Sequence, residues 1–121
     1  MAYEMFEKKK TTRNTGKFLT ITRQGTIRFS KKCYEEYMKE YDTIKFLFNA
    51  ETNCIGLKLY TEDDDNAYKI RKAKIKNSFA YSVSASAFLK FYDIDFSETK
   101  RYKPIWIEKK EMIKINLNKE I

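Results

Sequence analysis

The chain has 121 residues and a mass of 14.5 kDa, with 42% hydrophobic and 16% aromatic residues, so it can bury one core without disulfides or metal. Its 25 basic residues exceed its 17 acidic ones, and the formal charge of +8 favours a partner that carries phosphates. The lack of histidine and the presence of only three glycines exclude Ser-His and Cys-His catalytic pairs and glycine-rich phosphate loops, so we expect neither an enzyme nor a cofactor.

The sequence also predicts where the protein resides. It holds no apolar run of about eighteen residues, and its first ten residues are too charged for a signal peptide, so we expect a cytoplasmic protein without a membrane partner. Cys33 and Cys54 lack the spacing of metal ligands, which predicts buried, reduced thiols. Lysine outnumbers arginine, and asparagine, isoleucine and tyrosine are frequent, as in proteins of low-GC bacteria and their mobile elements.

Residues 1–17 are polar and basic without apolar periodicity, which predicts a flexible basic arm. In the next segment, 18–60, apolar and polar residues alternate on both sides of a turn at Gly25. Alternation with period two is typical of half-buried strands. The apolar positions of these two strands are Leu19, Ile21, Ile27 and Phe29.

The rest of this segment predicts a helix and a hairpin. Ser30 stands where an N-cap residue is expected, and apolar residues follow it at helical spacing, which predicts a helix over 31–40. Period two then returns on both sides of a polar connection at 49–53, as in a β-hairpin. The helix positions are Tyr34, Tyr37, Met38 and Tyr41, and the hairpin positions are Ile44, Phe46, Phe48, Ile55, Leu57 and Leu59.

The same order of elements recurs after an acidic linker at 61–66. Two strands are expected within 67–83 around a loop at 76–78, and Ser84 is expected to cap a helix over 85–92. Two last strands are expected at 105–107 and 112–117, with a turn between them. The acids Glu62 to Asp65 lack the spaced ligands and the glycine of a calcium loop, so we interpret them as a solvated link and expect no metal site.

The two halves align in kind and nearly in spacing. We therefore interpret residues 18–117 as one domain made of two pseudo-repeats, 18–60 and 67–117, the alternative being chance similarity between two amphipathic patterns. The aligned residues are Ile27, Phe29, Ser30, Cys33, Tyr34, Tyr37 and Met38 with Tyr81, Val83, Ser84, Ala87, Phe88, Phe91 and Tyr92, and Ile55, Leu57 and Leu59 with Ile113, Ile115 and Leu117. Neither half has enough apolar residues for a core of its own. The expected shared core consists of Phe29, Tyr34, Met38, Phe46, Ile55 and Leu57 with Val83, Phe88, Leu89, Ile105, Ile113 and Ile115.

The first half resembles the AbrB/MazE/SpoVT group of swapped-hairpin transcription factors and antitoxins. The matching residues are Arg23-Gln24-Gly25-Thr26-Ile27-Arg28-Phe29, then Ser30-Lys31-Lys32-Cys33-Tyr34, then the hairpin from Ile44 to Leu59. The second half matches less well and has Phe79 where the first has Gly25. The resemblance implies a mainly β fold with two short helices, in which two such units interleave into one barrel whose basic strands and loops bind DNA.

Clustered basic residues carry the functional prediction. A segment without acids, from Ala67 to Lys90, and the corresponding part of the first half would form one positive surface if the halves are related by pseudo-symmetry. The alternative is that these residues are only the solvated faces of strands in a lysine-rich protein. The predicted nucleic-acid-binding residues are Arg23, Gln24, Arg28, Lys31, Lys32, Lys69, Arg71, Lys72, Lys74, Lys76 and Asn77.

Three functions remain open from the sequence. The first is a small DNA-binding regulator or antitoxin-like protein, acting as a monomer or homodimer. The second is a protein-interaction module of a phage or plasmid that binds a host or toxin protein through the aromatic residues Tyr3, Phe6, Tyr102 and Trp106. The third, which the expectations above disfavour, is an enzyme or a binder of a small ligand such as a nucleotide in a basic pocket.

Overall fold

The computed structural model describes residues 16–62, 65–76 and 78–121. It is mainly β, with 45% strand and 17% helix, which confirms the predicted class of a β protein with two short helices. In chain order the elements are β1 (Leu19–Ile21), β2 (Thr26–Phe29), α2 (Lys31–Cys33), the π-helical turn η2 (Tyr34–Met38), β3 (Thr43–Asn49), β4 (Cys54–Tyr60), β5 (Tyr68–Lys69), β6 (Arg71–Ile75), β7 (Ser78–Ser84), α3 (Ser86–Phe91), β8 (Lys100–Tyr102), β9 (Ile105–Ile107), the 3-10 turn η3 (Glu108–Lys110) and β10 (Met112–Asn116).

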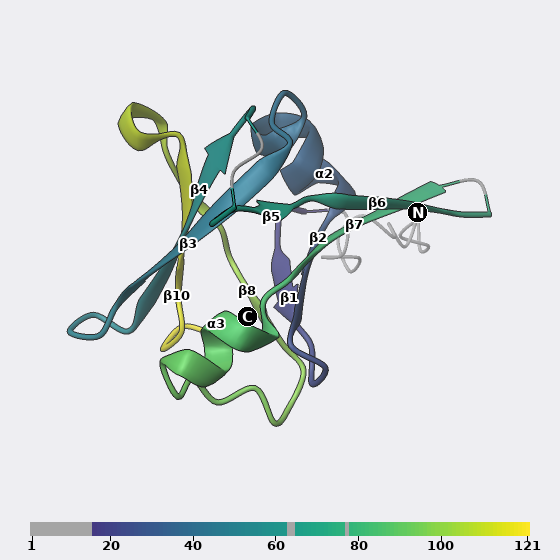
Figure 1. Ribbon diagram of the computed structural model, residues 1–121. Coiled ribbons are helices and arrows are strands. Elements are labelled where there is room, and N and C mark those ends of the chain that lie inside the picture. Colours follow the sequence, from purple (N-terminus) through teal and green to yellow (C-terminus); the bar gives the residue numbers. More distant parts are fainter. Residues whose placement is uncertain (1–15, 63–64, 77) are drawn as a thin grey trace, which may run out of the picture.

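The strands form two antiparallel five-stranded sheets. Sheet A has the order β6-β7-β2-β1-β8 and sheet B the order β5-β3-β4-β10-β9. α2 and α3 lie at opposite ends of the pair of sheets (Figure 1). The chain passes from sheet B to sheet A at Ile70, and from sheet A to sheet B at Lys103 and Pro104. Pro104 has no N–H to donate at that corner, and within the described residues the sheets do not close, so the barrel is not confirmed.

One hydrophobic core lies between the sheets and contains inward-facing residues of both halves. The rings of Phe46 and Phe88, one from each half, stack with their centroids 4.9 Å apart, and Phe46 packs on the core as a partly buried residue. The shared core is confirmed except for Ile105, which is 49% exposed. All three residues of the run Ile-Trp-Ile are apolar, so the sequence does not tell which of them face the core. In the structure Trp106 lies opposite the buried Ile113, and Ile105 therefore lies on the outer face.

Ser30 caps the first helix as predicted, because its Oγ accepts a hydrogen bond from the Cys33 N–H at 3.3 Å. The corresponding prediction for Ser84 is wrong. Ser84 is the last residue of β7 and pairs with Thr26, so α3 begins after Ala85, which provides no side-chain cap. No helix within the described residues is long and apolar enough to cross a membrane.

The register of the central pair in sheet A is symmetric. Arg28 of β2 lies opposite Ser82 of β7, and the sequence alignment of the two halves equates these two residues. The flanking pairs are Ile27 with Val83 and Phe29 with Tyr81. Ile27 therefore faces the counterpart of Phe29, and Phe29 faces the counterpart of Ile27. A local twofold axis through the Arg28–Ser82 pair would produce this exchange.

Sheet B repeats this register in its own central pair, β4 with β10. Gly56 lies opposite Lys114, its counterpart in the alignment. The flanking pairs, Ile55 with Ile115 and Leu57 with Ile113, are exchanged in the same way. The two sheets thus show the same pattern of exchanged pairs about their central pairs.

The first hairpins of the two halves differ in length. Gly25 has a φ of +83° in the β1–β2 turn, and its carbonyl accepts the Ala85 N–H at 2.9 Å, so this turn packs on the start of α3. Phe79, which replaces Gly25 in the second half, lies inside β7, and the turn falls earlier in the chain, near Lys76 with its φ of 56°. The β6–β7 hairpin is therefore longer and projects from the body (Figure 1).

Replacing Gly25 by alanine should destabilise the protein by about 2 kcal/mol or more, because a side chain in the left-handed region is strained and close contacts add to that cost. A Cβ at this position would lie 2.5 Å from Ser86 Cβ and 2.8 Å from Ser86 Cα. At Gly56 a Cβ would meet only the flexible sulfur of Met112, at 2.8 Å, so Gly56→Ala is the matched control. Urea unfolding of both variants tests the contrast, and similar costs would contradict it.

Candidate functional site

Three arginines lie in one line across the outer face of sheet A. Arg28 pairs with Ser82 on one side and Thr20 on the other, Ser82 pairs with Arg71, and Thr20 pairs with Arg101. Thr20, Arg28, Ser82 and Arg101 each adjoin buried residues along their strands, so their side chains point away from the core, and Arg71 shares this face through its pairing with Ser82. Neighbouring strands are about 4.8 Å apart, which spaces the arginine-bearing strands by about 10 Å. We call Arg71, Arg28 and Arg101 the arginine row.

The arginine row is accessible and has no acidic neighbour in its hollow. All three arginines are exposed, and the residues between them, Ser82 and Thr20, have short side chains. A hollow of about 490 Å³ runs beside Arg28 and Arg101, and none of the described residues that line it is acidic. Gln24 also lines it. The Arg101 guanidinium lies 4.7 Å from the centroid of the Phe18 ring, a cation–π contact that holds the end of the row in place.

The β6–β7 hairpin continues this basic surface away from the body. Every residue of β6 is exposed, with Arg71 on the face of the arginine row and Lys72 and Lys74 on the other face. The Lys72 ammonium lies 5.5 Å from the centroid of the Tyr34 ring, which in turn stacks on Tyr81 at 3.8 Å. The hairpin therefore presents positive charge on both of its faces.

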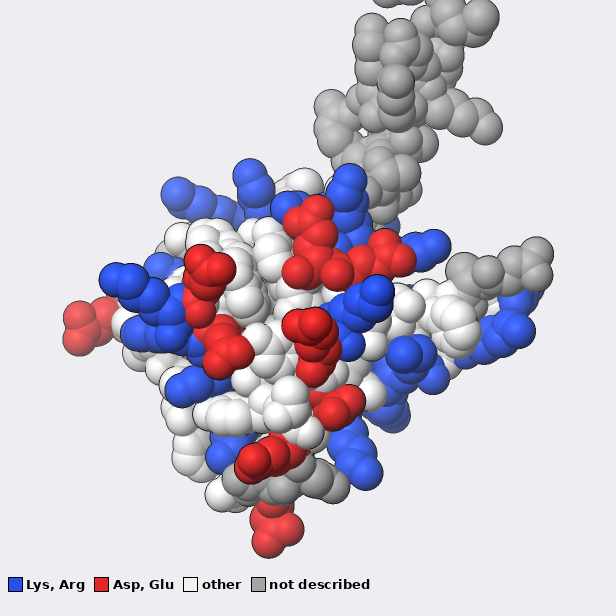
Figure 2. All heavy atoms as spheres, turned by 90° about the horizontal axis from the view of Figure 1, so that it is seen from above, with Lys and Arg blue, Asp and Glu red and all other residues white. Residues whose placement is uncertain are grey.

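Acidic and basic residues occupy different parts of the surface. Figure 2, which looks down on the α2 end, shows Asp and Glu in the middle of that end and Lys and Arg at its margins and along the projecting hairpin. Glu35 and Glu36, in the first turn of η2, contribute acids to this end. The outer face of sheet A, by contrast, bears the three basic residues of the arginine row.

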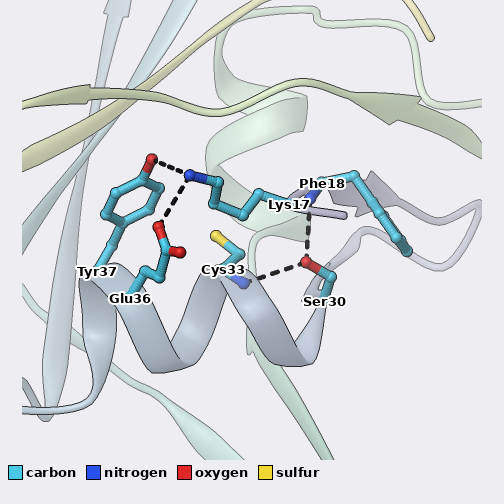
Figure 3. Close-up of polar contacts among 6 residues, drawn as sticks. All are labelled: Lys17, Phe18, Ser30, Cys33, Glu36 and Tyr37. Carbon is cyan, nitrogen blue, oxygen red and sulfur yellow. Dashed lines mark hydrogen bonds and ion pairs between the residues drawn. The ribbon is translucent and has the colours of Figure 1, made fainter. Parts of the chain in front are cut away.

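The start of β1 is anchored to the α2 end by polar contacts (Figure 3). The Lys17 ammonium donates to Glu36 Oε2 at 2.8 Å and to the Tyr37 hydroxyl at 3.1 Å. The Phe18 N–H donates to Ser30 Oγ at 3.0 Å, so the helix cap also holds the residue that supports Arg101. The hydrogen bond from Lys17 keeps the pKa of the Glu36 carboxyl below its usual value.

The cysteines take no part in this site. Both thiols are free and buried, which confirms the prediction from their spacing. Burial raises the pKa of the Cys33 thiol to about 12, so it stays protonated and unreactive at neutral pH.

Several predicted site residues lie apart from the arginine row. Arg23 lines a separate hollow, which Asp93 and Asp95 also line. Lys31 and Lys32 lie on α2, at the opposite end of β2 from Arg23. Lys69 belongs to β5 of sheet B, Lys76 is exposed near the end of the hairpin, and Asn77 lies outside the described residues.

Of the aromatic residues predicted for a protein partner, the two that the structure describes, Tyr102 and Trp106, do not form an exposed anchor. Tyr102 is only 5% exposed and belongs to the core, and Trp106 is partly buried with its ring stacked on Tyr37 at 5.1 Å. Tyr3 and Phe6 lie outside the described residues.

Arg101 is the functional candidate that the sequence did not indicate. It lies in β8, a strand of three residues with one buried side chain, Tyr102, in the stretch between the helix expected over 85–92 and the strand expected at 105–107. The only signal was that the basic residues Arg101 and Lys103 flank the aromatic Tyr102, which is too short a pattern to predict a strand.

Known proteins provide no further information about this site. No protein-family model, no curated protein and no solved structure matches this chain. The resemblance to the AbrB/MazE/SpoVT group therefore stays a prediction.

Proposed function

We propose that the protein binds nucleic acid, as a DNA-binding regulator or antitoxin-like protein, through the outer face of sheet A and the β6–β7 hairpin. The observation that carries this proposal is the arginine row, three exposed arginines in line across five paired strands, continuous with a basic two-stranded hairpin. Guanidinium groups bind phosphate oxygens with two parallel hydrogen bonds, and most protein–DNA hydrogen bonds go to the backbone.

The hairpin suits a groove of the duplex. The major groove is about 12 Å wide and admits a two-stranded β-ribbon. Lys72 and Lys74 on one face and Arg71 on the other would contact phosphates on both sides of such a groove. Gln24, in the hollow beside Arg28, is the candidate for a contact to a base edge.

The symmetric registers support a relation to the swapped-hairpin family. The axis-related pairs Arg28–Ser82 and Gly56–Lys114 are those expected if the chain is a duplicated ββαββ unit folded onto itself, the second unit having a longer hairpin. In this interpretation the chain is an opened form of the interleaved barrel. Fusion of two units into one chain would allow it to bind DNA as a monomer.

A salt titration tests the proposed function. About five phosphate contacts, from the arginine row and the hairpin lysines, would give a slope of log affinity on log salt of about −4.5 for duplex DNA. The affinity should then fall roughly 500-fold between about 50 and 200 mM salt. The measurement is fluorescence anisotropy with a labelled duplex and protein freed of nucleic acid by nuclease and high salt.

Two outcomes would count against the proposal. The first is no binding at the lowest salt. The second is a slope of about −1 or shallower, which means that a single phosphate is neutralised. A single-stranded probe run in parallel tells whether the groove is needed, because the slope per phosphate is about −0.7 for single strands.

A further inference from the structure

The outer face of sheet B has a different character from that of sheet A. One cross-strand row contains Leu47, Gly56, Lys114 and Ile105, in that order across β3, β4, β10 and β9. The next row contains Lys45, Lys58, Met112 and Ile107. This face therefore mixes exposed apolar residues with lysines.

Gly56 makes the centre of this face concave. It has no side chain between Leu47 and Lys114, and a hollow of about 540 Å³ lies over it. Leu47 is 47% exposed and Ile105 49%, so the face has an exposed apolar residue on each side of Gly56. An apolar depression on an otherwise highly charged protein indicates a binding surface.

The charges around the hollow have one sign. Lys58, Lys110 and Lys114 line it, and none of the described lining residues is acidic. Lys45 lies directly opposite Lys58, and like charges in that position destabilise a sheet. Both ammonium groups lie over the Tyr60 ring, at 5.0 and 5.8 Å, and these cation–π contacts offset part of that cost.

We infer that this face, the sheet B groove, binds an acidic amphipathic helix of a partner protein. Apolar residues of the helix would fill the depression over Gly56, and its carboxylates would pair with Lys58, Lys110 and Lys114. A second copy of this chain would bring like charges together. A strand added to sheet B would pair at an edge, beside β5 or β9, and would not cover the hollow, which lies over β4 and β10.

This inference does not depend on nucleic-acid binding. The sheet B groove and the arginine row are on the outer faces of different sheets, with the core between them. The protein could therefore hold DNA and an acidic partner at once. The sheet B groove is also a candidate surface for the protein interaction predicted from the sequence, and it differs from the aromatic residues named there.

The test uses a designed probe. A fluorescein-labelled helical peptide of about 18 residues, about 27 Å long, carries leucines on one face and glutamates on the others. Two control peptides replace the leucines by serine or the glutamates by lysine. The leucine–glutamate peptide should bind the full chain at least about tenfold more tightly than either control, since it alone offers both kinds of contact.

Variants locate the binding. Lys58→Glu with Lys114→Glu, and separately Leu47→Asp, should each weaken peptide binding at least about tenfold, because these residues are partly or largely exposed and the fold should persist. Gly56→Val should fill the depression and weaken binding at least about fivefold. A valine suits a strand, and the Cβ would displace only the end of Met112.

Arg28→Ala with Arg71→Ala serves as the matched control and should leave peptide binding within about twofold, because both arginines lie on the other sheet. Equal binding of the serine control peptide, no binding of any peptide, or unchanged binding by the groove variants would overturn the inference. So would a loss of DNA affinity in the Lys58/Lys114 variant as large as in the arginine variant, which would make this face part of the nucleic-acid interface.

Discussion

Truncation of Phe88 to alanine should lower the free energy of unfolding by about 3–5 kcal/mol, the cost typical of removing a buried phenyl ring. Phe88 is 8% exposed and stacks on Phe46 at 4.9 Å, and its ring also meets the edge of Tyr92 at 5.2 Å. Because Phe46 and Phe88 come from different halves, the cavity would open inside the shared core. Denaturant unfolding monitored by tyrosine and tryptophan fluorescence measures the change.

Phe91 provides the matched control on the same helix. Its side chain is 80% exposed and meets the edge of the Tyr92 ring at 4.9 Å, so Phe91→Ala should cost less than about 1 kcal/mol. Phe88→Ala should also keep a single unfolding transition, because one core unfolds as a unit. Two separate transitions, or equal costs at Phe88 and Phe91, would mean that the halves have independent cores.

Local patterns predicted most elements because each depends on nearby residues. Alternation located the strands of both hairpins in the first half, and Ser30 located the start of α2. Local sequence patterns failed to predict the bounds and type of an element where tertiary contacts determine them. The pairing of Ser84 with Thr26 extends β7 past the expected cap, and nothing local indicates the π-helical turn after Cys33.

The site could be predicted in part for the same reason. Arg28 and Arg71 lie at outward positions of alternating strands, so the alignment of the two halves indicated a common surface. Lys69 was grouped with Arg71 because both fall in one basic run, but the chain changes sheets at Ile70 between them. Arg101 joins the arginine row through the pairing of β8 with β1, a contact between residues far apart in sequence that leaves no local pattern.

Replacement of Arg28 and Arg71 by alanine should weaken DNA binding at least tenfold at about 150 mM salt and flatten the salt slope by about 1.8, because two phosphate contacts are lost. Both side chains are exposed, so the stability should change by no more than about 0.5 kcal/mol per substitution. The variant with lysine at both positions keeps the charge and loses the paired hydrogen bonds of the guanidinium. It should therefore retain most of the slope while binding less tightly.

The comparison that decides between a site and diffuse attraction uses Lys109 and Lys119. Both are exposed and lie outside sheet A, in η3 and near the end of the chain, and their replacement by alanine removes the same charge. Any loss of positive charge reduces the attraction of DNA to a +8 protein slightly, so this control should lose less than about threefold in affinity. Anisotropy titrations of the wild type and all three variants at several salt concentrations supply the comparison. If the lysine pair matters as much as the arginine pair, the arginine row is not a binding site, and the sheet B groove with its acidic partner becomes the better account of the protein.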